Sequence, residues 1–96
     1  MSAVRSHRYS VADADLEEFL ARRASLIATV RERHPGLTRT VLIRLEDGTY
    51  TDTWHWEDAG QMGAAFAAIA TFAEAPLTMA LTKDATAQNG QVVDER

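Results

Sequence analysis

The stretch from Leu37 to Trp56 constrains the fold most, because it holds two strand patterns joined by a tight-turn signal. Its first part, Leu37 to Leu45, contains T-V-L-I-R-L and is rich in β-branched residues. Its second part, Thr49 to Trp56, alternates, with threonines and a histidine on one face and four residues on the other: Tyr50, Asp52, Trp54 and Trp56. Between them lies Glu46-Asp47-Gly48, and Asp-Gly is a strong hairpin-turn pair. The sequence therefore predicts an antiparallel hairpin with one aromatic face.

A strand and a helix are expected before this hairpin. Val4 to Val11 has rough strand alternation, and Leu16 to about Arg33 carries its apolar residues on one helical arc. Asp15 followed by Glu18 predicts a capping box at the helix start. Pro35-Gly36 should end the helix, because proline cannot continue it and glycine supplies a positive φ.

A second helix is expected from Ala59 to Ala73, opened by the capping pair Asp58 and Gln61. It contains no charged residue, which predicts that it is covered on more than one side. Residues 76–82 either belong to an irregular connection or form a short third helix that begins at Pro76. A last strand is expected around Gly90 to Val93, with a bulge at Asn89-Gly90 favoured over a tight turn.

The predicted order β-α-β-β-α-β is typical of an α+β, ferredoxin-like domain: a four-stranded antiparallel sheet with both helices on one face. Residues 1–96 are expected to form a single such domain. The other face of the sheet would be bare, and a second copy of the chain is its simplest cover. We therefore expect a homodimer.

Composition limits the kinds of binding partner and the cellular location that the sequence predicts. The net charge of −4 argues against nucleic-acid and membrane-surface binding, which need a basic excess. The chain has no cysteine, no long apolar run and no signal-peptide pattern, so a cytoplasmic protein without a membrane segment is expected. Its histidines show no metal-ligand spacing, so no metal site is expected.

Several motifs occur together along nearly the whole chain. An acid-capped helix ends in His34-Pro35-Gly36, an Asp47-Gly48 hairpin follows, and a strand ending W-x-W-E-D (Trp54 to Asp58) runs into an alanine-rich helix. With the closing segment G-Q-V-V-D-E-R, this combination resembles the dimeric α+β barrel superfamily, and within it the antibiotic biosynthesis monooxygenase-like proteins of actinobacteria. The resemblance implies a homodimeric barrel and oxidation of a small aromatic compound without a cofactor.

The haem-degrading branch of the same superfamily fits less well. Trp56 matches a tryptophan that lines the haem pocket in that branch. The branch also uses an asparagine on the first strand and a histidine on the second helix. Here the first strand has no asparagine, and the corresponding helix positions are Ala65 and Phe66. The sequence therefore disfavours haem, and the resemblance to the monooxygenase-like proteins implies that no other cofactor is needed.

The aromatic face of the hairpin is the main candidate site. Trp54 and Trp56 are expected to bind substrate, although an aromatic stripe at strand spacing more often fills a core. Asp52 and Tyr50 are candidate catalytic groups, because a carboxylate among aromatic rings is partly desolvated and can act as a base. The alternative for Asp52 is an ion pair with an arginine on a neighbouring strand, Arg39 or Arg44.

Four further residues complete the predicted site. Arg23 lies on the apolar arc of the first helix, where it either meets an anionic ligand, extends past the sheet edge or pairs with an acid. Met62 and Phe66 belong to the apolar stripe of the second helix and are assigned to substrate binding. His7, on the first strand, is the third catalytic candidate.

Three functions are compatible with these residues. The chain is a cofactor-independent monooxygenase-like enzyme, a non-catalytic dimer that binds a small aromatic ligand, or an interaction module whose second helix docks a larger partner. An apolar cavity between sheet and helices would favour the first two over the third. A titratable group inside that cavity would favour the first over the second.

Overall fold

The structure, a computed structural model, describes residues 2–96. Its strands are β1 (Ala3–Val11), β2 (Leu37–Arg44), β3 (Tyr50–Trp56) and β4 (Thr82–Gln91). Its helices are α1 (Leu16–Arg33), α2 (Ala59–Ile69) and α3 (Glu74–Met79), and a single 3₁₀ turn, η1 (Asp13–Asp15), precedes α1.

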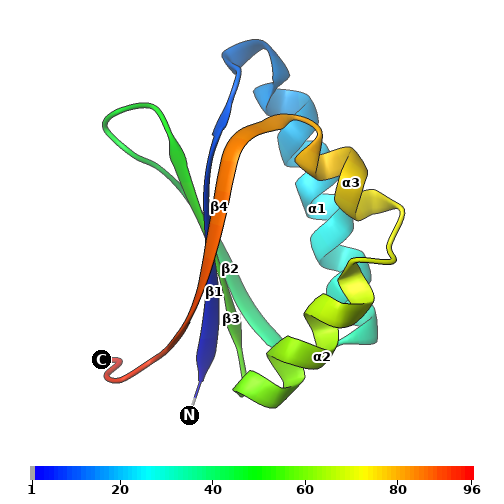
Figure 1. Cartoon of the computed structure of the whole chain (residues 1–96), viewed down its shortest axis with the longest axis vertical. Coiled ribbons are helices and arrows are strands. Elements are labelled where there is room, and N and C mark those ends of the chain that lie inside the picture. Colours follow the sequence, from blue (N-terminus) through cyan, green and yellow to red (C-terminus); the bar gives the residue numbers. More distant parts are fainter. Residues whose placement is uncertain (1) are drawn as a thin grey trace.

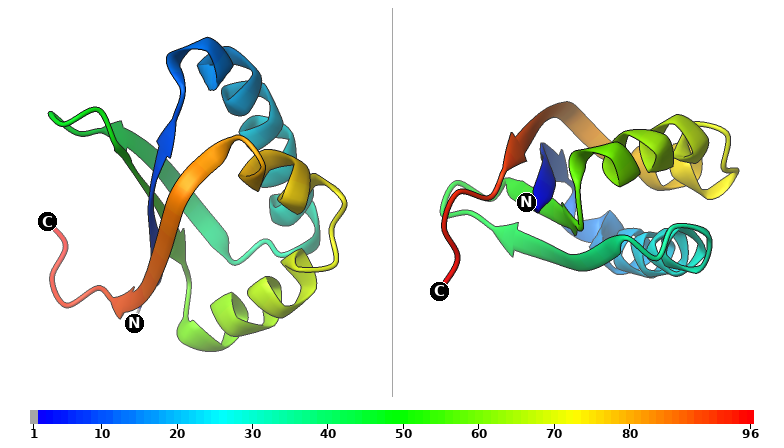
Figure 2. Two further views of the ribbon diagram at one scale, coloured as in Figure 1. Left: turned by 45° about the horizontal axis from the view of Figure 1, so that its top comes forward. Right: turned by 90° about the horizontal axis from the view of Figure 1, so that it is seen from below.

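The four strands form one sheet in the order β2-β3-β1-β4, and every neighbouring pair is antiparallel. All three helices lie on the same side of the sheet (Figures 1 and 2). This arrangement confirms the predicted α+β, ferredoxin-like βαββαβ fold, with α3 as an addition before the last strand. None of the helices in residues 2–96 is long and apolar enough to cross a membrane.

The pairing of β1 with β3 decides which side chains face the helices. His7 lies opposite Asp52, and Arg5 lies opposite Trp54. Because side chains alternate along each strand, odd-numbered residues of β1 and even-numbered residues of β3 point toward the helices. The predicted aromatic face of the hairpin is thus the inner face, as the burial of all four of its residues confirms.

The core consists of two apolar clusters at opposite ends of the inner face. One cluster, around Trp56, packs β3 against α1 and α2. The other joins Tyr9, Val11, Phe19 and Tyr50. Asp52 lies on β3 between Tyr50 of one cluster and Trp54 of the other, so a buried carboxylate separates the two.

Helices α1 and α2 begin in different ways. Asp58 caps α2 as predicted: its Oδ1 accepts a hydrogen bond of 2.8 Å from the backbone N–H of Gln61. The predicted box at Asp15 and Glu18 is wrong, because Asp15 has helical backbone angles and its side chain makes no capping hydrogen bond. Turn η1 leads directly into α1, so Asp15 already belongs to a helical turn and cannot adopt the extended conformation of a cap.

The second helix is shorter than predicted. It ends at Ile69 instead of Ala73, and Phe72 beyond it is buried. The short third helix is present, but it begins at Glu74, two residues before Pro76. Proline fits there because the first N–H groups of a helix have no partner within it. The exposed Ala64 and Ala67 show that the single chain leaves one side of α2 uncovered, so the predicted cover on that side stays a prediction.

Strand β4 starts earlier than predicted, at Thr82, and ends at Gln91. Its sequence is polar and weakly strand-forming, so pairing with β1 determines its conformation. The predicted bulge at Asn89-Gly90 is wrong, since Gly90 pairs regularly with Val4. The register shifts instead near Asp84, which has a φ of 55°, opposite Tyr9.

Gly36 has a different role from the predicted one. In residues 2–96 the glycine with a positive φ is Gly48, in the hairpin turn, at 86°. Gly36 lies directly against the side chain of Gln61, where a Cβ atom would collide with the Gln61 amide. Its lack of a side chain therefore permits the close approach between the end of α1 and the start of α2.

Candidate functional site

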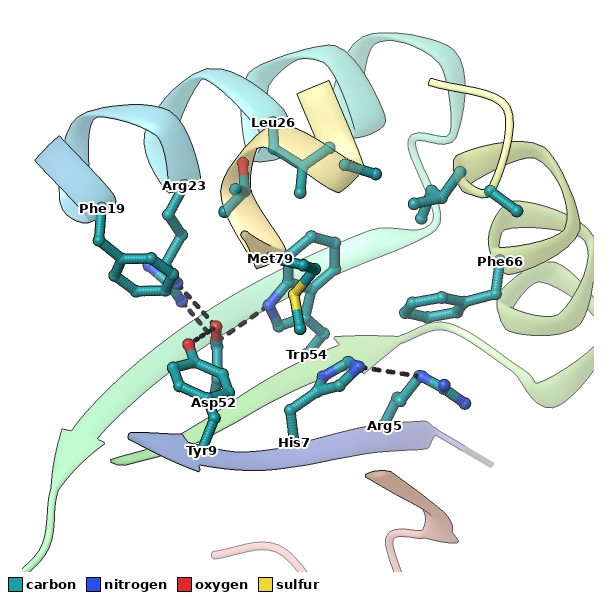
Figure 3. A pocket seen from close by; sticks show the side chains of 14 residues that line it. Arg5, His7, Tyr9, Phe19, Arg23, Leu26, Asp52, Trp54, Phe66 and Met79 are labelled. Carbon is teal, nitrogen blue, oxygen red and sulfur yellow. Dashed lines mark hydrogen bonds and ion pairs between the residues drawn. The ribbon is translucent and has the colours of Figure 1, made fainter. Parts of the chain in front are cut away.

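A cavity of about 300 Å³ lies between the inner face of the sheet and the helices (Figure 3). Five of the predicted site residues line it: His7, Arg23, Asp52, Trp54 and Phe66. The helices supply most of the apolar wall, including side chains that sequence reasoning did not select: Phe19, Leu26, Ile69 and Met79. Its size is at the lower end of the range found for small-molecule sites, about 300–1,000 Å³.

Three predicted residues lie outside the cavity. Tyr50 is buried in the second cluster, and its hydroxyl accepts hydrogen bonds of 3.0 and 2.8 Å from Arg44. Trp56 and Met62 are buried in the first cluster. The cavity borders only the middle of β3, at positions 52 and 54, because apolar packing fills both ends of the inner face. The sequence pattern predicted the correct face of β3, but it did not predict how far along β3 the site extends.

The most important omissions are Arg5 and Tyr9 on β1, which line the cavity on either side of His7. A signal for them was present, since residues two positions from His7 share its face of the strand. Helix α3 contributes Ala75, Thr78 and Met79. No sequence pattern predicted that this short helix would close one wall.

Asp52 is the centre of a buried hydrogen-bond network (Figure 3). Its Oδ2 accepts from Arg23 Nε at 2.9 Å and from the Tyr9 hydroxyl at 2.7 Å. Its Oδ1 accepts from Arg23 Nη2 at 2.8 Å and from Trp54 Nε1 at 3.0 Å. Of the alternatives left open for Arg23, pairing with an acid is the one observed. The predicted alternatives for Asp52 were wrong: Arg44 contacts Tyr50, and Arg39 lies opposite the outward-facing His55.

The network leaves Asp52 little capacity to react. A carboxylate has about four lone-pair sites, and all four are occupied by donors here. Three of these donors are N–H groups that cannot accept a proton in return. The side chain is therefore fully engaged in hydrogen bonds to the walls of the cavity, which suits a positioning role better than that of a base.

Burial and hydrogen bonding together fix the charge of the two groups that face Asp52. Burial, the charge of Asp52 and its hydrogen bond raise the pKa of Tyr9 well above the ordinary value of 10.0. For Arg23, burial alone would lower the pKa, but the hydrogen bonds and the charge of Asp52 outweigh it and raise the pKa above its ordinary value. Tyr9 is thus a neutral donor and Arg23 a permanent cation.

His7 is a titratable group of the cavity that makes no hydrogen bond to the Asp52 carboxylate. Arg5 Nε donates a hydrogen bond of 3.3 Å to His7 Nε2, which puts the lone pair of the imidazole on that nitrogen. Burial and then the positive charge of Arg5 lower the pKa of His7 below 6.5, against an opposing contribution from Asp52. His7 is therefore a neutral imidazole near pH 7.

Phe66 packs against several of these groups from α2. Its ring lies 6.1 Å from Trp54 and 6.2 Å from His7, centroid to centroid. The Arg5 guanidinium lies over the same ring, 4.5 Å from its centroid. These contacts hold Arg5 and His7 side by side at the edge of the aromatic wall (Figure 3).

Metal chemistry finds no support in the arrangement. Across the described residues, no group of three or more histidine and acidic side chains is placed to hold a metal ion. Asp52, the buried acid, is saturated by its own donors.

The fold and the cavity define a ferredoxin-like α+β protein with an aromatic-lined pocket between sheet and helices. Comparison with known proteins found no matching family model and no matching curated sequence. Solved structures do match. A variant of SnoaB, a cofactor-independent oxygenase from Streptomyces nogalater, superposes with a TM-score of 0.79 at 23% identity, over 98% of this chain and 95% of that one.

Two other solved structures are also similar to this chain. A protein described as an antibiotic biosynthesis monooxygenase has a TM-score of 0.67 at 18% identity, covering 98% of this chain and 100% of its own. A conserved protein from Methanosarcina mazei has a TM-score of 0.73 at 14% identity, covering 95% and 92%. The structural neighbours are thus antibiotic biosynthesis monooxygenase-like proteins, as the sequence resemblance implied. At these identities the likeness shows the fold, and the activity has to be argued from the site.

Proposed function

We propose that this chain is an antibiotic biosynthesis monooxygenase-like protein that binds a small aromatic compound in its cavity and oxidises it with molecular oxygen, without a cofactor. The observation that carries the proposal is the aromatic-lined cavity with a neutral histidine, His7, in its wall. The cavity favours a small-molecule site over a docking module, and the titratable histidine favours catalysis over simple binding.

The chemistry requires a substrate that can itself reduce oxygen. In the proposed step a weakly acidic C–H or O–H of the aromatic compound gives its proton to His7. The resulting anion passes one electron to O₂, and the radical pair combines to form a C–O bond. The peroxide anion takes the proton back from His7, and for a substrate CH₂ group the resulting hydroperoxide then loses water and leaves a carbonyl, so that O₂ supplies one oxygen atom to the product and one to water.

The three predicted catalytic residues take different roles in this proposal. His7 is the base, because its imidazole is neutral and borders the cavity. Asp52 is a positioning residue that fixes Trp54 and Tyr9 through its hydrogen bonds. Tyr50 is structural, because it is buried away from the cavity. Trp54 and Phe66 form the stacking surface for the ring, whereas Trp56, Met62 and Arg23 support this surface from the core and the network.

A homodimer and a cytoplasmic location also belong to the proposal. The outer face of the sheet carries the partly exposed Val41 and the exposed Ile43 among small polar residues. A second copy packed on this face would cover them and complete the dimeric barrel that the resemblance implies.

The proposal is tested by oxygen uptake with a panel of electron-rich phenols and hydroxynaphthalenes, measured in the presence of a metal chelator. The account expects one or more compounds to be consumed with O₂, and it expects His7→Gln to lose the activity while keeping ligand binding. The control is His55→Gln, on the outer face. Binding without oxygen uptake in the wild type would instead support a non-catalytic binding protein.

A further inference from the structure

The charges that border the cavity do not cancel. Arg23 and Asp52 form a closed ion pair, with their nearest atoms 2.8 Å apart. Tyr9 and His7 are uncharged near neutral pH for the reasons given above. Arg5 remains, and no acidic side chain in residues 2–96 lies within ion-pairing distance of it. The lining of the cavity therefore carries one net positive charge.

The hydrogen bonds that hold Arg5 leave its guanidinium able to bind an anionic ligand. Its Nε donates to His7 at 3.3 Å, and its Nη1 donates to Asn89 Oδ1 at 3.1 Å, so both partners are neutral. For Nη2, the part of the chain that the structure describes supplies no hydrogen-bond acceptor. The guanidinium also rests on the Phe66 ring, at the end of the surface where an aromatic ligand would stack.

We propose that Arg5 makes the cavity selective for a monoanionic aromatic ligand, such as a phenolate, an enolate or an aromatic carboxylate. The inference rests on the proposed small-molecule site and adds the charge of its ligand. The ring lies on Trp54 and Phe66, and the anionic oxygen receives hydrogen bonds from Arg5. Such a ligand cancels the unpaired charge of an otherwise apolar pocket, whereas a neutral ligand leaves it uncompensated.

The hydrogen bond between Arg5 and His7 links the binding of an anionic ligand to the proposed base, His7. Arg5 occupies the lone pair of His7 Nε2 through a long, weak hydrogen bond. An anionic oxygen is a stronger acceptor than an imidazole and draws the guanidinium away. His7 Nε2 is then free to accept a proton from a further acidic C–H or O–H of the bound monoanion.

The test compares 2-naphthoate with its neutral analogue 2-naphthamide, which has the same ring system. Dissociation constants are measured by titration calorimetry at neutral pH and low salt for the wild type, Arg5→Gln and Arg5→Lys. Arg8→Gln is the matched control, because Arg8 lies on the same strand but pairs with Asp47 on the outside of the molecule.

The wild type and Arg8→Gln are expected to bind naphthoate at least about tenfold more tightly than naphthamide, since a hydrogen bond to a charged group is worth that factor or more. Arg5→Gln should abolish the preference, and Arg5→Lys should keep part of it. Equal binding of both probes by the wild type would overturn the charge selectivity and leave the aromatic site standing. Binding of neither probe would overturn both.

Discussion

The guanidinium of Arg23 on α1 donates two hydrogen bonds, 2.9 and 2.8 Å long, to the carboxylate of Asp52 on β3. Both side chains are largely buried, with exposed fractions of 13% and 8%. The pair connects the helix layer to the middle of the sheet, between the two apolar clusters of the core. It also forms one wall of the cavity, so the stability of the fold and the shape of the site depend on the same contact.

Replacing Arg23 with methionine should therefore destabilise the protein strongly. The change leaves the Asp52 carboxylate buried without its counter-ion, which costs about 3–5 kcal/mol in comparable cases. The free energy of unfolding is measured by urea denaturation monitored by circular dichroism. Arg22→Met is the control, because Arg22 lies nearer the surface, where it pairs with Glu18 and donates a hydrogen bond to the Leu77 carbonyl, and its loss should cost no more than about 2 kcal/mol. Equal effects of the two substitutions would contradict the role given to the buried pair.

Tyr9→Phe should destabilise the protein less than Arg23→Met does. It should also change how the free energy of unfolding responds to alkaline pH. It removes the 2.7 Å hydrogen bond to Asp52, worth roughly 1.5–3 kcal/mol, and leaves the ring in place. Because the pKa of Tyr9 is raised in the folded protein, only the unfolded chain loses this proton just above pH 10.0, and stability falls there as pH rises. Unfolding curves at increasing pH should show this fall in the wild type, and its persistence in Tyr9→Phe would contradict the assignment.

His7 should make the protein less stable in mild acid. Its pKa is lowered in the folded state, so below pH 6.5 the unfolded chain binds a proton that the folded chain does not. Stability is therefore lost as pH falls below 6.5, and His7→Gln should remove this part of the loss. The imidazole resonances in an NMR titration give the pKa directly. Arg5→Gln should raise it, since the charge of Arg5 contributes to the lowering.

The outer face of the sheet provides a test of the proposed homodimer. Ile43→Lys places a charge on that face, where the wild-type side chain is 50% exposed. Leu20→Lys makes the same kind of change on α1, at a side chain that is 44% exposed. Light scattering should show dimers for the wild type and Leu20→Lys, and monomers for Ile43→Lys. A wild-type monomer at micromolar concentration would reject the dimer.

The sequence predicted the fold well because its central signals are local. Alternation in β3 and the Asp58 cap each depend on neighbours in the chain, and both are present in the structure. The start of β4 at Thr82 could not be predicted, because its polar residues form a strand only through pairing with β1. The end of α2 at Ile69 likewise depends on the burial of Phe72 against other elements.

The site was predicted only in part, for a related reason. His7, Asp52 and Trp54 follow from which strand face is apolar, and the inner face does hold the cavity. The partner of Asp52 could not be inferred from strand positions, because Arg23 reaches it from a helix 29 residues earlier. Whether Trp54 or Trp56 borders the cavity depends on where the helices leave space, which no local pattern encodes.

These two tryptophans, the only ones in the chain, allow the most direct test of the cavity as an aromatic ligand site. Trp56→Phe retains Trp54 in the cavity wall, and Trp54→Phe retains Trp56 in the core. The measurement is the change in tryptophan emission of each variant on titration with benzoate, an anionic single-ring acid that hardly absorbs at the long-wavelength edge of the tryptophan band where the protein is excited, with binding followed independently by calorimetry. The account predicts a saturable change in Trp56→Phe at the concentration where ligand binds, and little change in Trp54→Phe. An equal response from both variants, or a response from Trp56 alone, would contradict it.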